Sequence, residues 1–202
     1  GKFVAFHNYR GSLTATMEGM LDAYYFGRRP CAVMMPNFRN VYKQDSNFQR
    51  GYMTFYSATR QGWSRAVPDD IGLGESLKDT LTGAGGWSVY MMMQGETIPK
   101  ESNHVRLSKD KVDEMGLPEL IVSVGYDHND ELVLKDFSEQ AAEMLDVAGG
   151  KNIAFHDSRQ APGLDIHEMG GVRMGLDPKT SLLNGWNQLH TCKNVFVTDG
   201  AC

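Results

Sequence analysis

The sequence predicts an α+β fold, a largely antiparallel multi-stranded sheet with helices packed on one face. Short runs rich in β-branched, aromatic and Met residues are separated by Gly, Pro and Asn turn signals, which is typical of strands. One long segment has clear helical periodicity. Strands and helices do not alternate regularly, as they would in a parallel α/β sheet, so an antiparallel sheet is the simpler expectation.

The first half of the chain is expected to be strand-rich. Its candidate strands are Cys31–Met35, Gly51–Ser57 and Trp87–Gln94. In the second of these, two alternating sets of side chains offer two distinct faces, Tyr52, Thr54 and Tyr56 against Met53 and Phe55. Such faces suit a sheet that is covered on one side and lines a cavity on the other. The run Met91-Met92-Met93 is expected to fill the core rather than to bind a ligand.

The second half combines short strands with the clearest helix. Pro99–Leu107 reads as a turn feeding a strand, and Asp113–Pro118 as another turn. Further strands are expected at Glu119–Tyr126, Asn152–Phe155 and Asn194–Thr198. A helix is expected from about Asn129 to Val147, with apolar residues at helical spacing, Asp130 and Glu131 favouring its N-terminus, and Gly149-Gly150 supplying a left-handed cap.

Composition excludes several classes of protein. The 202 residues suffice for one substantial domain or two small ones. The net charge is −5 and no basic run exceeds Arg28-Arg29, which argues against a nucleic-acid partner. No apolar run approaches the ~20 residues of a membrane span. The three cysteines lack metal-ligand spacing, and reduced thiols are expected in preference to a Cys192–Cys202 disulfide.

The segment 165–201 carries the strongest chemical signal. His167 precedes Gly170 and Gly171, which allow positive φ and a close approach of the backbone to a flat or anionic ligand. An imidazole beside such a surface suits a general base next to a cofactor. Taken alone, a His before Gly-Gly is a weak signal, and a His that bonds its own turn is the favoured interpretation.

Three motifs in this segment resemble the glucose–methanol–choline (GMC) family of FAD-dependent oxidoreductases. They are His167–Gly175, Asp177–Ser181 and Asn194–Ala201, which match in order and spacing. The His-x-Met-Gly-Gly variant is similar to the pyranose oxidase and gluconate-dehydrogenase-like branches. The resemblance extends over roughly residues 95–201 and is diffuse before them.

The resemblance implies a role for each matched residue. His167 falls on the catalytic base, which takes the substrate hydroxyl proton while hydride passes to flavin N5. Asp199, Gly200 and Ala201 fall on the strand end that contacts FAD, near the glycines of the turn. A turn cap is the alternative for Asp199. For Arg173 a structural ion pair is favoured over contact with the reduced flavin.

The same resemblance implies an organisation in two parts. Residues 1–164 would form the substrate-binding domain, and 165–202 the active-site His segment with a strand returning to an N-terminal FAD-binding domain of the same polypeptide. The chain has no complete Gly-x-Gly-x-x-Gly fingerprint. We therefore read the chain as a fragment whose second catalytic residue lies after Cys202, and expect it neither to bind FAD tightly nor to turn over alone.

Other polar and aromatic residues remain open candidates. Rings that would stack on a sugar if they share the cavity face, with core packing as the default, are Trp63, Trp87, Tyr52, Tyr56 and Tyr90. Candidates for contact with substrate hydroxyls are Arg60, Arg65, His7 and Arg10. His156-Asp157 and His190 lack metal-site spacing and are expected to be ordinary surface or turn residues.

Two classes of function compete on this sequence. The leading one is oxidation of a CH–OH group of a sugar, a sugar acid or another alcohol. The alternative is a non-catalytic, β-rich module that binds carbohydrate or protein. The motif pair at His167–Gly175 and Asp199–Ala201 favours the enzyme. The substrate, the electron acceptor and the oligomeric state stay open, and a bacterial cytoplasmic or periplasmic location is expected.

Overall fold

The computed structural model describes residues 1–19, 32–36, 39–62, 65, 67, 69–83, 85–164 and 166–202. These residues form two sheets, and the α+β prediction is confirmed. The six-stranded sheet has the path β4-β5-β6-β3-β9, with β2 paired to β6. Its strands are β2 (His7–Asn8), β3 (Gly11–Met17), β4 (Val33–Met35), β5 (Tyr52–Arg60), β6 (Trp87–Glu96) and β9 (Lys151–Asp157).

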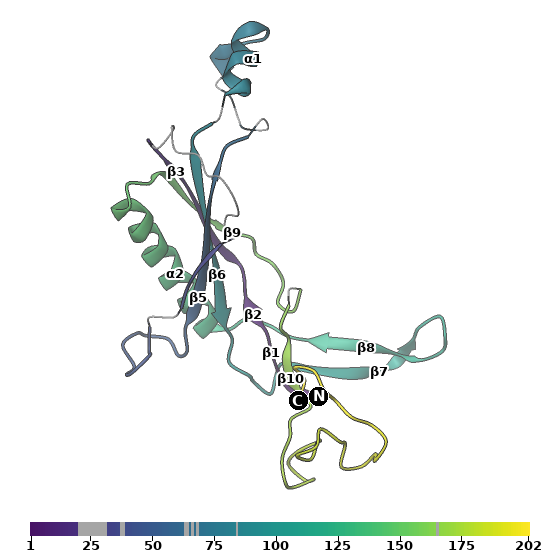
Figure 1. Ribbon diagram of the computed structural model, residues 1–202. Helices are drawn as coiled ribbons and strands as arrows, with labels where there is room; N and C mark the ends of the chain where they lie inside the picture. Colours follow the sequence, from purple (N-terminus) through teal and green to yellow (C-terminus); the bar gives the residue numbers. More distant parts are fainter. Residues whose placement is uncertain are drawn as a thin grey trace.

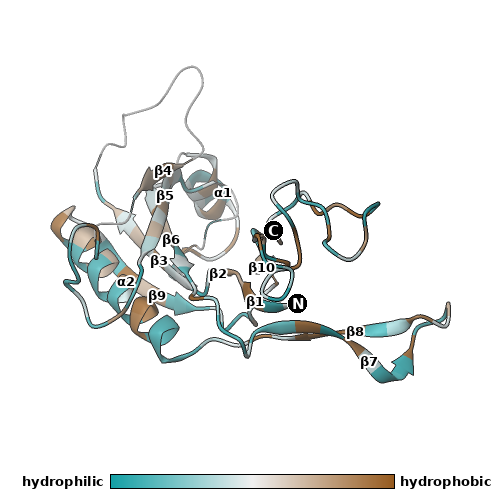
Figure 2. Ribbon diagram, turned by 90° about the horizontal axis from the view of Figure 1, so that it is seen from below, coloured by the Kyte–Doolittle hydropathy of each residue, from teal (hydrophilic) through white to brown (hydrophobic). Residues whose placement is uncertain are grey.

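The four-stranded sheet has the order β10-β1-β7-β8 and is antiparallel throughout. Its strands are β1 (Lys2–Ala5), β7 (His104–Val112), β8 (Pro118–Ser123) and β10 (Met169–Gly171). Figures 1 and 2 show β7 and β8 as a ribbon that extends away from the six-stranded sheet. The N-terminus lies at β1 and the C-terminus lies near β10 (Figures 1 and 2).

Helix α2 (His128–Val147) covers one face of the six-stranded sheet (Figure 1). The helix begins at an N-cap, Asp127, whose side chain accepts hydrogen bonds from the backbone of Asn129 and Asp130. In return, the Asp130 carboxylate accepts a hydrogen bond from the Asp127 backbone N–H at 2.8 Å, which completes a capping box. Gly149 adopts a φ of 86° just after the helix, as the left-handed cap predicted for this position requires.

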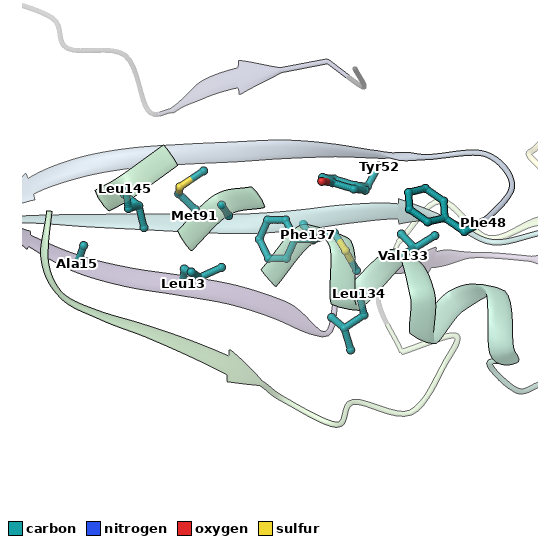
Figure 3. Packing of buried hydrophobic residues seen from close by; sticks show 11 residues of the cluster. Leu13, Ala15, Phe48, Tyr52, Met91, Val133, Leu134, Phe137 and Leu145 are labelled. Atoms are coloured by element: carbon teal, nitrogen blue, oxygen red, sulfur yellow. The ribbon is translucent and has the colours of Figure 1, made fainter. Parts of the chain in front are cut away.

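The core lies between α2 and the sheet, as Figure 3 shows. Its buried residues are Leu13, Ala15, Phe48, Tyr52, Met91, Met93, Val133, Leu134, Phe137, Ala141 and Leu145. Burying large apolar side chains of this kind contributes about 1.5–3 kcal/mol each. The core role predicted for the Met run is confirmed for Met91 and Met93, while the intervening Met92 lies on the opposite face of the sheet.

Side-chain hydrogen bonds form at the edges of this core. The Tyr52 hydroxyl donates to Asp136 at 2.8 Å, and burial with this hydrogen bond raises the pKa of Tyr52. On the other side, Arg10 donates from Nε and Nη2 to the two carboxylate oxygens of Asp157, at 3.0 and 2.6 Å. Its guanidinium holds the pKa of Asp157 below its ordinary value.

Several predicted elements differ from the structure. Asn194–Thr198 is not a strand, because its backbone pairs through a single bridge, Gln188↔Phe196, before the chain turns. Four strands and a helix were not predicted, namely β1, β2, β3, β10 and α1 (Glu75–Thr82). Cys31, predicted to begin a strand, lies outside the described residues. The division at residue 164 stays a prediction.

In the ranges that the structure describes, no helix is long and apolar enough to cross a membrane. Cys192 and Cys202 are free thiols, so the disulfide between them that was considered less favoured is not formed.

Candidate active site

A glycine-rich turn brings the end of the chain against its beginning. β10 pairs antiparallel with β1, with Lys2 opposite Gly171 and Ala5 opposite Met169. Gly170 and Gly171 have φ angles of 79° and 95°, in the region that favours glycine. A Cβ placed on Gly170 would overlap the carbonyl oxygen of Phe3. Glycine at this position therefore lets β1 and the turn approach each other.

The last residues of the chain are bound to the same turn. The Gly170 amide donates to the Gly200 carbonyl at 2.8 Å, and the Val172 amide donates to the Ala201 carbonyl at 2.9 Å. Gly200 is tightly packed, since a Cβ there would lie 2.7 Å from the carbonyl oxygen of Glu168. All five residues predicted to contact a cofactor are thus gathered at one place.

These residues line a hollow of about 700 Å³, called the site hollow below. Its polar side is formed by His167, Gly170, Gly171, Asp199, Gly200 and Ala201. Its apolar side is formed by Val4, Phe6, Val105, Val122 and Val124, which come from the four-stranded sheet and its flanks. The volume falls within the range of about 300–1,000 Å³ that is usual for small-molecule sites.

His167 stands at the edge of the site hollow in a strained backbone conformation. Its φ is 65°, a value that few residues other than Gly adopt and that is found disproportionately at functional sites. Its imidazole is exposed, and its Nδ1 lies 3.1 Å from Nε2 of His7. The two rings meet edge to face, with centroids 5.2 Å apart. Among the residues that the structure describes, His167 makes no hydrogen bond to its own turn.

His7 was one of four residues that the sequence offered without selecting among them. The structure places His7 beside His167, whereas the other three bond carboxylates or backbone carbonyls elsewhere. Arg10 bonds Asp157 and Glu131, Arg60 donates to the Gly85 carbonyl, and Arg65 donates to carbonyls at Gln61, Gly62 and Gly83. His7 alone among the four contacts the predicted catalytic residue.

Asp199 caps its own turn, as the alternative interpretation of this residue holds. Its Oδ1 accepts from the Ala201 amide at 3.0 Å. The side chain is exposed at the site hollow, so contact with a cofactor stays a prediction for it.

Arg173 differs from its prediction. A structural ion pair was predicted for Arg173. Among the described residues, no Asp or Glu carboxylate forms an ion pair with it. Instead Nε and Nη2 both donate to the Thr180 carbonyl, at 2.9 and 2.7 Å, and the guanidinium lies 5.9 Å from the Phe3 ring centroid. The two N–H groups of the guanidinium fork thus reach the two lone pairs of one carbonyl oxygen, a contact that ties Arg173 to the backbone of its own segment.

The face of the six-stranded sheet opposite α2 is hollowed beside β5 and β6. This second hollow, of about 360 Å³, is lined by Phe55, Tyr90, Met92, Gln94 and their neighbours. As predicted, α2 covers one face of this sheet, and the opposite face carries an open hollow. Of the candidate sugar-stacking rings, Tyr52 lies in the core, Tyr56 packs against it, Trp87 contacts Arg60, and Trp63 lies outside the described residues. Tyr90 alone presents an exposed ring to this face.

Metal chemistry finds no support in the described part of the chain. It contains no group of three or more His, Cys, Asp or Glu side chains arranged to hold a metal ion. Asp157 is bound to Arg10, and His190 Nε2 lies 3.1 Å from both the Ser181 hydroxyl and the Gly175 carbonyl.

Sequence reasoning did not single out His7 as the neighbour of His167, and its local pattern explains why. Its strand β2 has only two residues, too few for an alternation signal. The neighbouring β3 does carry such a signal, since Leu13 and Ala15 are buried while Ser12 and Thr14 face away from the core. Recognising β3 would have placed His7 next to the sheet, though not next to His167.

Comparison with known proteins gives a consistent result. A family model described as GMC oxidoreductase matches residues 99–202, about half of the chain. Paromamine 6'-oxidase of Streptomyces fradiae is 36% identical over 102 residues, which cover 50% of this chain and 18% of that protein. Fructose dehydrogenase large subunit of Gluconobacter japonicus is 27% identical over 170 residues, 77% of this chain and 30% of that protein.

A third relative is named for a smaller alcohol. The 2-methyl-1,2-propanediol dehydrogenase of Mycolicibacterium austroafricanum is 32% identical over 120 residues, 57% of this chain and 21% of that protein. The chain spans between 18% and 30% of the length of these three relatives.

Proposed function

Because this chain belongs to the GMC oxidoreductase family, we propose that it is the C-terminal part of an FAD-dependent enzyme that oxidises a CH–OH group of a sugar, a sugar acid or another alcohol. The names of its relatives support this substrate class, since they include a paromamine 6'-oxidase, a fructose dehydrogenase and a 2-methyl-1,2-propanediol dehydrogenase. An N-terminal FAD-binding domain of the same polypeptide is the proposed partner of the site hollow.

The observation that carries the proposal is the position of His167. It stands at the edge of a hollow whose polar side consists largely of glycine backbone, at Gly170, Gly171 and Gly200. Backbone without side chains lets a large planar group lie close to it. In the described part of the chain, no hydrogen bond occupies Nε2 of His167, so this nitrogen is available to a substrate. The residues present therefore fit one side of a flavin site.

The roles of the chain's residues follow from this arrangement. FAD, when bound, supplies the acceptor for the hydride that leaves the substrate carbon. Nε2 of His167 takes the proton of the substrate hydroxyl, so that the oxygen forms the new carbonyl with the electron pair of its former O–H bond. The exposed Asp199 and the glycines hold the cofactor in place. The apolar valines of the site hollow exclude water from this side.

The test is replacement of His167 by Ala in the flavin-loaded full-length protein. Anaerobic flavin reduction would be followed by the loss of flavin absorbance, with paromamine, fructose and 2-methyl-1,2-propanediol as a panel of alcohols. We expect the limiting reduction rate to fall by roughly 100-fold or more, the scale of a lost general base.

The control variant is His128→Ala, which changes an exposed His at the start of α2 outside the site hollow. Its reduction rate should equal that of the wild type. An unchanged rate in His167→Ala would remove His167 from the mechanism, and a full-length protein without bound flavin would contradict the proposal as a whole.

A further inference from the structure

Two histidines from opposite ends of the chain share one hydrogen bond. Nε2 of His7 and Nδ1 of His167 are 3.1 Å apart. Neutral imidazole carries one N–H and one unprotonated nitrogen, so one of these two atoms must donate and the other must accept. Which one donates decides whether His167 is able to act as a base, because the proton on a neutral ring occupies either Nδ1 or Nε2.

The other nitrogen of His7 favours one direction for this bond. Nδ1 of His7 faces the carbonyl oxygen of Gly95 at 3.4 Å. A carbonyl oxygen only accepts hydrogen bonds, so the favourable arrangement places the proton of His7 on Nδ1. Nε2 of neutral His7 is then unprotonated and accepts from Nδ1–H of His167. The opposite assignment would set a lone pair of His7 against the oxygen of Gly95.

From this geometry we infer that His7 is a positioning residue that holds His167 in the tautomer with its proton on Nδ1 and its Nε2 free. The inference rests on the proposed function, since it assigns a role in the same reaction. Nε2 is the nitrogen with no partner among the described residues, and it is the one left to receive the hydroxyl proton. When that proton arrives, the bond from Nδ1–H to His7 becomes charge-assisted and therefore stronger.

The fold holds His7 in place from several sides. In β2, His7 pairs with Glu96 and Asn8 pairs with Gly95, so the ring is fixed beside β6. Gly95 permits this close approach, because a Cβ there would lie 3.1 Å from the Cβ of Asn8. The Tyr9 ring meets the His7 ring edge to face at 5.1 Å. The orientation of His7 is thus set independently of His167.

The first experiment compares two amides at position 7 in the flavin-loaded full-length protein. The Gln side chain has an N–H donor and an oxygen acceptor, and it is long enough to replace both bonds of His7. The Asn side chain has the same groups but is one methylene shorter, so it reaches Gly95 and not His167.

We expect His7→Asn to lower the limiting rate of flavin reduction by about 10-fold or more, with KM changed less than about 2-fold, because base positioning acts on the chemical step. His7→Gln should restore the rate to within about 3-fold of wild type. The substrate is the alcohol of the panel that reduces the flavin fastest.

A double variant separates this inference from the proposed function. If His7 acts through His167, adding His7→Asn to His167→Ala costs nothing further. Equal slowing by His7→Asn in both backgrounds would mean that His7 acts on substrate directly and would overturn the inference. Slowing by His167→Ala without slowing by His7→Asn would also overturn it, while leaving the proposed function intact. No slowing by His167→Ala would contradict the proposed function itself.

A second measurement does not depend on whether the variants at position 7 fold. The full-length protein labelled with ¹⁵N-histidine gives ring-nitrogen signals that distinguish the two tautomers, and the signals lost in His167→Ala identify His167. We expect a protonated Nδ1 and an unprotonated Nε2. A proton on Nε2 of neutral His167 would overturn the inference.

Discussion

Gly170 lies so close to Phe3 that a Cβ at position 170 would overlap the Phe3 carbonyl oxygen. The two residues join β10 to β1 and so fix the turn that carries His167. Any side chain at position 170 must push β1 away from the site hollow. This contact makes the geometry of the site depend on a residue that has no functional group of its own.

The first prediction is that Gly170→Ala damages both stability and activity. The added Cβ meets backbone that cannot rotate away, and the φ of 79° is itself unfavourable for Ala, so we expect a loss of about 2 kcal/mol or more in the free energy of unfolding. The rate of flavin reduction should fall as well, because His167 moves with the turn. Denaturant unfolding and stopped-flow reduction of the full-length protein would measure the two effects.

Gly116 offers a matched control for Gly170. It has the same φ of 79° but no atom within 4 Å of an added Cβ. Gly116→Ala should therefore cost only the backbone strain, about 1 kcal/mol, and leave the reduction rate unchanged. Equal losses in the two variants would show that contact with Phe3 is unimportant.

The second prediction concerns Arg173, whose two donors meet the Thr180 carbonyl. Arg173→Gln removes this fork and should lower the free energy of unfolding by about 1 kcal/mol. The limiting rate of flavin reduction should stay within about 3-fold of wild type, because the guanidinium is engaged with backbone. A fall of 10-fold or more would show instead that Arg173 faces the reduced cofactor. Arg106→Gln, at an exposed position of β7, is the control.

The third prediction concerns pH and the buried Asp130. Burial raises the pKa of this carboxyl from 3.8 to about 6, although the backbone bond from Asp127 opposes the shift. The folded protein thus holds this proton more tightly than the unfolded chain. The resulting stabilisation is fully present below about pH 4 and is lost as the pH rises through about 6, by up to about 3 kcal/mol. The pKa of Asp157 is lowered, so its titration changes the free energy of unfolding only at lower pH.

Replacing Asp130 by Asn should abolish this dependence. The amide oxygen keeps the bond from the Asp127 backbone, so the capping box survives while the ionisable group is gone. Unfolding free energies measured between about pH 4 and 7 should be flatter in Asp130→Asn than in wild type. Glu143→Gln, an exposed change on the same helix, should leave the slope as it is. A wild-type slope in Asp130→Asn would rule out Asp130 as its source.

Helices and strands that are determined by their own residues were predictable from the sequence. The helix α2 follows from its periodic apolar residues and its terminal Asp and Gly residues, and it begins within one residue of the predicted start. Strands β5 and β6 follow from their aromatic and β-branched content. By contrast, β10 consists of Met and two glycines, and it is a strand only because β1 is there to pair with it.

The site was predictable in part for the same reason. The motifs located His167, the two glycines of the turn and the segment Asp199–Ala201, and the structure brings them together. His7 is 160 positions from His167, and nothing near it in the sequence reveals that partner. The wrong prediction at Asn194–Thr198 has the converse cause, since its local pattern suits a strand but only one bridge forms.

The contacts of the site have a consequence for the order of synthesis and folding. His7 with His167, Phe3 with Gly170 and Lys2 with Gly171 all join the first residues of this sequence to residues after 160. A growing chain makes β5, β6 and the hairpin of β7 and β8 from neighbouring segments, whereas these pairs wait for distant partners. On the ribosome, these pairs therefore form only after residue 171 has been synthesised, later than the contacts within and between β5, β6, β7 and β8.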